Sequence, residues 1–150
     1  MKKEYLILIL IIAGLSAYLF LHKENRDNYT LPAIEKIDTA NITAIEITRS
    51  DSTVRLDKAD KAWTVTDGKF PADASMVETL LDTIKTFRLT ALVSQKSDLS
   101  RYELDKGSRI AVRFFESDSP VFELTIGKDA PTFNHTFVMV GSDPNVYHAA

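Results

Sequence analysis

Three patterns of hydrophobic and polar residues follow one another along the chain. Residues 5–21 read YLILILIIAGLSAYLFL and contain no formal charge. From about residue 42 apolar and polar residues alternate, which predicts β-strands, whereas residues 73–88 repeat their apolar positions at helical spacing. The chain is therefore expected to begin with an apolar helix and to continue as a domain of strands and one amphipathic helix.

The uncharged run at residues 5–21 predicts a membrane anchor. At about 1.5 Å per residue it would span roughly 26 Å, slightly less than a hydrocarbon core of about 30 Å, and flanking lysines such as Lys3 and Lys23 would reach the interface. A cleaved signal peptide is the alternative, but bulky Leu15 makes a poor cleavage site. We expect residues 1–22 to form a single-pass anchor with a short cytoplasmic N-terminus.

The chain after this anchor is long enough for one modest domain. Residues 23–40 are polar and contain Pro32, so they are expected to be a linker. Lysine and arginine are nearly balanced on the two sides of the anchor, and long domains translocate with little regard to charge. Residues 41–150 are therefore expected to form a domain outside the cytoplasm.

Alternating segments at the start of this domain predict three short strands. Polar connections at residues 49–52 and 58–61 separate them and are typical of hairpin loops. An antiparallel meander with one apolar and one polar face is the expected arrangement. The second half of the domain alternates in the same way, from about residue 110 to residue 146.

The helix expected at residues 73–88 has a recognisable start. Asp73 or Ser75 is suited to cap its N-terminus, and Ser75-Met76-Val77-Glu78 has the form of a capping box. The predicted fold class is α+β: an N-terminal transmembrane helix followed by antiparallel β-meanders with one packed amphipathic helix. The predicted core consists of Ile45, Ile47, Val54, Leu56, Trp63, Val65, Leu80, Leu81, Ile84, Val112, Phe114, Leu124 and Ile126.

One short tripeptide occurs in both β regions. Ser50-Asp51-Ser52 and Ser117-Asp118-Ser119 each stand between two alternating segments. One interpretation is that the domain contains two weakly similar β units. The other is chance, because Ser and Asp are common in turns.

Composition restricts the partners, covalent links and cofactors that this chain is expected to have. The 150 residues carry a net charge of −3 and no basic stripe with interleaved aromatic residues, which argues against nucleic acid as a partner. The absence of cysteine excludes disulfides and a lipoprotein anchor. His135 and His148 lack the close spacing of zinc or calcium ligands, so no metal or other cofactor is expected.

Few residues are candidates for a site. His135 with Asp129 nearby would be a base with an orienting carboxylate, but no Gly-x-Ser-x-Gly or other nucleophile motif accompanies it, so an enzyme is not expected. No catalytic residue is therefore assigned. The candidate ligand contacts are Phe133, His135 and Tyr147.

An ordered set of short motifs resembles a known family. These are Ile45-Glu46-Ile47, Trp63-Thr64-Val65, Phe70-Pro71-Ala72-Asp73, Leu80-Leu81, Tyr102-Glu103-Leu104-Asp105, Ile126-Gly127-Lys128, Thr136-Phe137-Val138 and Val146-Tyr147. Over about residues 42–148 they resemble domain-of-unknown-function family 4340. Two departures are Glu103, where the family usually has Gly, and Lys106-Gly107 in place of a common Pro. Relatives often continue further, so the chain is either truncated at Ala150 or a minimal version.

The resemblance implies a bacterial protein of the inner membrane, because members of the family typically carry an N-terminal anchor, and many of them are encoded beside a gliding-motility-type ABC exporter. We expect a non-catalytic, membrane-anchored extracytoplasmic accessory or scaffold subunit of an envelope complex. Its expected partners are the lipid bilayer, through residues 5–21, and an ABC permease. A ligand-binding module for envelope polysaccharide is the alternative, with Phe133 or Tyr147 as contacts, and a hydrolase using His135 is the third hypothesis.

Overall fold

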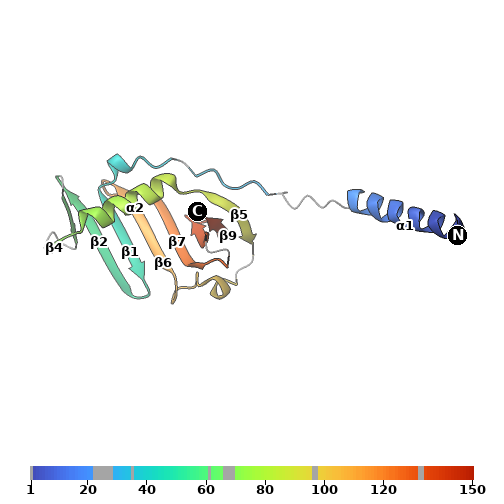
Figure 1. Ribbon diagram of the computed structural model, residues 1–150. Coiled ribbons are helices and arrows are strands. Elements are labelled where there is room, and N and C mark those ends of the chain that lie inside the picture. Colours follow the sequence, from blue (N-terminus) through green and yellow to red (C-terminus); the bar gives the residue numbers. More distant parts are fainter. Residues whose placement is uncertain are drawn as a thin grey trace. The chain divides into compact units, whose positions relative to one another are not determined.

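The computed structural model describes residues 2–21, 29–34, 36–60, 62–65, 70–95, 98–131 and 134–150. The chain forms two units, Met1–Thr30 and Leu31–Ala150. The first contains helix α1 (Lys2–Leu21), and the second contains all the strands and helix α2 (Ala74–Thr86) (Figure 1). Each unit is described by itself.

Helix α1 corrects the sequence prediction. Within the described part of the chain, no helix meets the length and hydropathy needed to cross a bilayer. Three of the 20 residues of α1 are charged, namely Lys2, Lys3 and Glu4, and the uncharged remainder spans only about 26 Å. The predicted fold class is therefore wrong in its transmembrane helix, and the predicted single-pass location in the inner membrane is wrong with it.

The described strands form one antiparallel sheet of nine strands in the order β4-β3-β2-β1-β6-β7-β8-β9-β5. Their bounds are β1 Ala44–Arg49, β2 Ser52–Ala59, β3 Ala62–Val65, β4 Phe70–Pro71, β5 Leu89–Ser94, β6 Ile110–Glu116, β7 Ser119–Asp129, β8 Thr136–Val140 and β9 Val146–Ala149. Two meanders run outward from the central pair β1 and β6, one ending at β4 and the other at β9. Strand β5 pairs with β9 at the far edge.

Both repeated tripeptides form hairpin turns. Ser50 joins β1 to β2 with φ 52°, and Ser117 joins β6 to β7 with φ 56°. Two-residue hairpin turns often require this left-handed backbone, because it follows the twist of the strands. The two hairpins are neighbours, since β1 pairs with β6 along its whole length, from Ala44 opposite Phe115 to Arg49 opposite Ile110.

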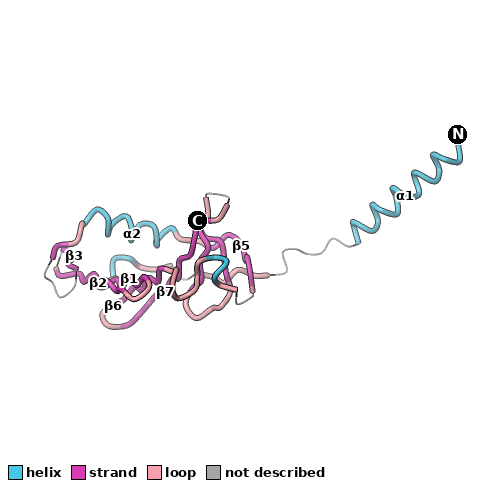
Figure 2. Tube along the Cα trace, turned by 90° about the horizontal axis from the view of Figure 1, so that it is seen from below, coloured by secondary structure: helices cyan, strands magenta, loops and turns pink. Residues whose placement is uncertain are grey.

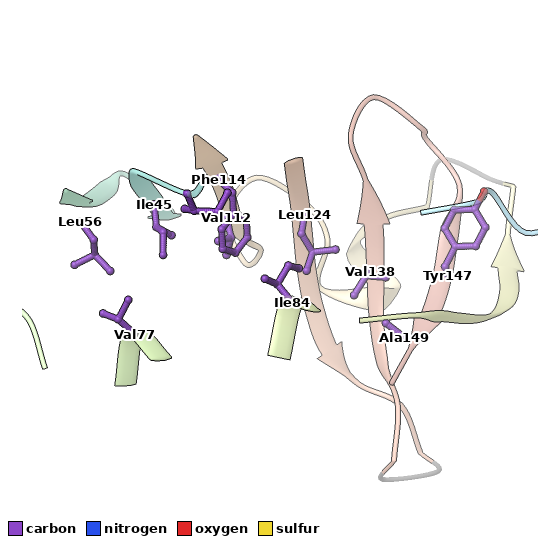
Figure 3. Close-up of a cluster of buried hydrophobic side chains, with 11 residues drawn as sticks. Ile45, Leu56, Val77, Ile84, Val112, Phe114, Leu124, Val138, Tyr147 and Ala149 are labelled. Carbon is purple, nitrogen blue, oxygen red and sulfur yellow. The ribbon is translucent and has the colours of Figure 1, made fainter. Parts of the chain in front are cut away.

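Helix α2 covers one face of the sheet. Asp73 caps it, accepting hydrogen bonds from the backbone N–H groups of Ser75 at 2.9 Å and Met76 at 3.3 Å. Val77 and Ile84 point from the helix toward the apolar side chains of the strands (Figure 3). Figure 2 shows α2 as a layer beside the strands. The predicted helix and the first of its two candidate caps are confirmed.

The predicted core is largely confirmed. Of its members, Ile45, Leu56, Ile84, Val112, Phe114 and Leu124 are buried, and all the others except Val54 are partly buried and packed against them. Val54 is wrong, because it is 43% exposed. The sequence analysis missed a second cluster, which comprises Leu104, Ala130, Phe137, Met139 and Val146.

The segment before β1 belongs to the compact unit. Leu31 and Ile37 pack against the core, and Ile42 is fully buried. Between them a short 3-10 helix, η1 (Thr39–Asn41), is capped by the Asp38 carboxylate, which accepts from the Ala40 N–H at 3.1 Å. Part of the segment expected to be a linker therefore contributes to the folded unit.

Candidate functional site

His135 and Tyr147, the two candidate contact residues that the structure describes, do not form one site. Tyr147 belongs to the large core cluster on the α2 side of the sheet. Its neighbour His148 instead stacks near His135, with ring centroids 5.5 Å apart, and near Phe137 at 4.9 Å. Successive strand residues point to opposite faces. Phe133 lies outside the described residues.

Tyr147 is a structural residue. Its side chain is only 3% exposed, and its hydroxyl donates to Asp143 Oδ2 at 2.6 Å. Burial, with the hydrogen bond to Asp143 as a second cause, raises the pKa of Tyr147 above its ordinary value. The described conformation leaves its ring no face on which a sugar can stack.

On the other face, the side chain of His148 lies against that of His135. Burial lowers the pKa of His148, and the nearby charge of His135 lowers it further. His148 Nε2 is buried and has no hydrogen-bond partner among the described residues. Asp129, the carboxylate expected near His135, accepts a hydrogen bond at its Oδ1 atom from Thr136 Oγ1, at 3.3 Å. Within the described residues no three His, Cys, Asp or Glu side chains are grouped as metal ligands.

An apolar groove of about 310 Å³ lies between the first half of α2 and strands β1 to β4. Its floor is the apolar sheet face, including Ile47 and Leu56, and Val77 and Leu80 of α2 form its wall. Met76, at its rim, is 72% exposed. The helix therefore leaves part of the apolar sheet face uncovered.

Two further exposed apolar side chains belong to the same end of the sheet. Phe70 is 65% exposed and lies opposite Val65, a lining residue of the groove. Val54 is 43% exposed and lies opposite Ile47, another lining residue. The groove and these neighbours form a continuous apolar surface.

Sequence reasoning missed this surface, although two signals were present. Met76 lies one helical turn before Leu80, at the edge of the apolar stripe of the helix. Phe70 directly precedes Pro71, a residue type that sheets accept mainly in edge strands. Both residues were apolar without a place in the predicted core. Such residues are the ones to examine for exposure.

The opposite face carries a row of alternating charges across four strands. Arg55, Glu46, Arg113 and Glu123 are successive partners in the register of β2, β1, β6 and β7. Arg113 lies 3.3 Å from Glu46 and 3.6 Å from Glu123. Because these side chains are partly exposed, the pairs add little stability and mainly keep this face polar.

Comparison with known proteins gives one match. The family model described as "Domain of unknown function (DUF4340)" matches residues 63–150, which is more than half of the chain. The match confirms the resemblance that the ordered motifs indicated. No curated protein and no solved structure matches the chain.

Proposed function

This chain belongs to the DUF4340 family, a domain of unknown function, and from that premise we propose that it is a non-catalytic, protein-binding accessory subunit of an envelope complex. The proposal assigns binding to the groove between α2 and strands β1 to β4. It assigns no reaction to any side chain.

The observation that carries the proposal is the exposed apolar surface at that groove. Monomeric soluble proteins seldom leave contiguous apolar side chains uncovered unless another molecule covers them. Phe70 and Met76, the most exposed members, are of the residue types enriched at protein interfaces. An apolar segment of a partner protein would bury both.

The proposed partner is a subunit of an ABC-type exporter. Support for this choice comes from the family resemblance, since members are often encoded beside such an exporter. The short edge strand β4, with two residues, borders the groove and ends at Pro71. Because proline donates no hydrogen bond, side-chain contacts in the groove are a better basis for binding than strand addition at this edge.

A small-ligand module is the second candidate, and one observation favours it. A hollow of about 440 Å³ lies between the segment before β1 and strands β6 to β8, with Ile37 and Phe122 among its apolar lining and Lys36 and Glu116 among its polar lining. Its volume falls in the range of ligand pockets. Tyr147 is no longer a candidate contact for a polysaccharide, because its ring is buried.

Purification of the tagged full-length chain from its native cells tests the proposal. We expect an ABC permease or ATPase to copurify with the natural protein and to be lost with Met76→Glu, which places a charge at the groove. Thr79→Glu is the matched control, since Thr79 is exposed on α2 and does not line the groove. Equal recovery from both variants would contradict the role of the groove.

A further inference from the structure

A small charged hollow opens on the sheet face opposite α2. It has a volume of about 100 Å³, and its lining includes Lys106, Arg109, Ala111 and Arg113. Ala111 and Arg113 of β6 share a face of the sheet, and Arg109, which directly precedes the strand, lines the hollow with them. The small Ala111 stands between two arginines and leaves the space above it open.

One arginine of this hollow has carboxylate partners. Arg113 lies between Glu46 and Glu123, at 3.3 Å and 3.6 Å. Its charge is shared with two carboxylates, but its guanidinium has more donors than these two contacts use. Arg113 is therefore a positioned donor at one wall of the hollow.

The other two cations have no such partners. Among the described residues, neither Lys106 nor Arg109 has a carboxylate within salt-bridge distance. The nearest acidic residue in sequence, Asp105, accepts hydrogen bonds from its own turn, from the Gly107 N–H and the Ser108 hydroxyl, both at 3.3 Å. Two cationic side chains thus line the hollow without an ion pair to any described carboxylate.

The loop that carries Lys106 is attached to the sheet. Ser50 Oγ, in the β1–β2 turn, donates to the Gly107 carbonyl oxygen at 2.8 Å. Thr48 Oγ1 of β1 and Thr53 Oγ1 of β2 share a hydrogen bond of 3.0 Å. Thr48 and Ser50 line the hollow as well, so hydroxyl groups lie beside the cationic ones.

We propose that this hollow binds a phosphate group, with Lys106, Arg109 and Arg113 as its cationic contacts. Three cations lie near two carboxylates, Glu123 in the lining and Glu46 beside Arg113, so the site keeps an excess of positive charge. Arginine and lysine are the residues that recognise phosphate oxygens, by paired hydrogen bonds and as a point charge respectively. The inference is independent of the protein-binding groove, which lies on the other face of the sheet.

Titration of the full-length protein with inorganic phosphate, followed by NMR or calorimetry at constant ionic strength, tests the site. We expect saturable binding that moves the backbone signals of Ala111 and Gly107. In the double variant Lys106→Ala, Arg109→Ala the affinity should fall at least about tenfold, because two charge-assisted contacts are lost. Lys85→Ala, which removes an exposed cation of α2, should bind as the natural protein does.

The variant Ala111→Leu tests whether the hollow itself, rather than the general positive charge of the surface, binds phosphate. It keeps every cation and fills the space, so it should abolish phosphate binding while the far-ultraviolet circular dichroism stays unchanged. Absence of saturable phosphate binding in the natural protein would overturn the proposal, as would full binding by the folded Ala111→Leu variant. Binding of acetate as tight as that of phosphate would also overturn the assignment to phosphate.

A parallel titration with methyl phosphate distinguishes the two sources of the group. Affinity equal to that of inorganic phosphate would show that the hollow takes a phosphate carried by a larger molecule. Binding of inorganic phosphate alone would show that the free ion is the ligand. Either result supports the site.

Discussion

Glu46 and Arg113 stand directly opposite each other at the centre of the sheet, on the neighbouring strands β1 and β6, with Arg113 Nη1 donating to Glu46 Oε1 at 3.3 Å. The pair is separated by 67 residues, the same offset that relates Ser50 to Ser117. Ile45 opposite Phe114 and Ile47 opposite Val112 flank it symmetrically. The hairpin of β1 and β2 and the hairpin of β6 and β7 are therefore arranged symmetrically on the two sides of this pair.

The Glu46–Arg113 pair should contribute little to stability. A double-mutant cycle with Glu46→Ala and Arg113→Ala is expected to give a coupling free energy below about 1 kcal/mol, because Arg113 is 48% exposed and solvent screens the charges. Denaturant unfolding at low and high salt measures it, and the coupling should shrink as salt rises. A salt-independent coupling of several kcal/mol would contradict this.

Gly127 should be required by close packing. A Cβ there would overlap the carbonyl oxygen of Tyr102 and lie 2.9 Å from Leu104 Cγ, so Gly127→Ala must displace the loop that covers β7. We expect a loss of about 1–3 kcal/mol in the free energy of unfolding, the usual effect of overpacking. Urea denaturation measures it. Gly107→Ala is the control, because a Cβ there meets only Asp105 Oδ2 at 3.5 Å.

The Tyr147 hydroxyl should stabilise the turn before β9. Tyr147→Phe removes its hydrogen bond to Asp143, and a hydrogen bond to a charged group contributes about 1.5–3 kcal/mol to stability. Urea denaturation should show that loss. Tyr102→Phe is the control, because Tyr102 packs its ring on Phe137 and no hydrogen bond of its hydroxyl is seen among the described residues. Equal effects of the two substitutions would refute this role.

His148 should make stability depend on pH. Its pKa is lowered in the folded state, so below the ordinary value of 6.5 the unfolded chain binds more protons than the folded one. The free energy of unfolding should therefore fall as pH decreases from 6.5 toward the lowered pKa, and be fully retained above 6.5. His148→Gln should flatten this dependence, whereas an unchanged slope in that variant would assign it to other groups.

His135→Gln gives a second measurement on the histidine pair. Removing the charge of His135 eliminates the smaller cause of the shift, while burial, the larger cause, remains. The pKa of His148, followed by NMR titration, should therefore rise only part of the way toward 6.5. A complete return to the ordinary value would mean that burial has no role.

The hydrophobic pattern correctly predicted those strands and helix ends that depend only on residues close together in the sequence. Period-two alternation located β1, β2 and β3, and the Asp73 cap located the start of α2, because both depend on neighbouring residues. The burial of a side chain depends also on residues that are far away in the sequence. Val54 alternates in phase with Leu56, yet it is 43% exposed, because alternation determines the face on which a residue lies and not what covers that face.

The second cluster and the candidate sites required long-range information. Leu104 is fully buried because its loop folds over the sheet face that the alternation assigned to polar residues. The cationic hollow depends on the placement of Lys106 beside β6, which a hydrogen bond from Ser50 to Gly107 across 57 residues secures. The prediction for helix α1 was wrong because it relied on flanking lysines to make up the length that residues 5–21 lack.

The most direct test of the central claim is site-specific photo-crosslinking of the full-length protein in its native cells. A photoreactive amino acid replaces Met76 at the rim of the groove, and Thr79 in the control, followed by mass spectrometry of the products. We expect one crosslinked protein, an ABC exporter subunit, from position 76 and none from position 79. No crosslink from position 76, or the same products from both positions, would contradict a docking surface at the groove.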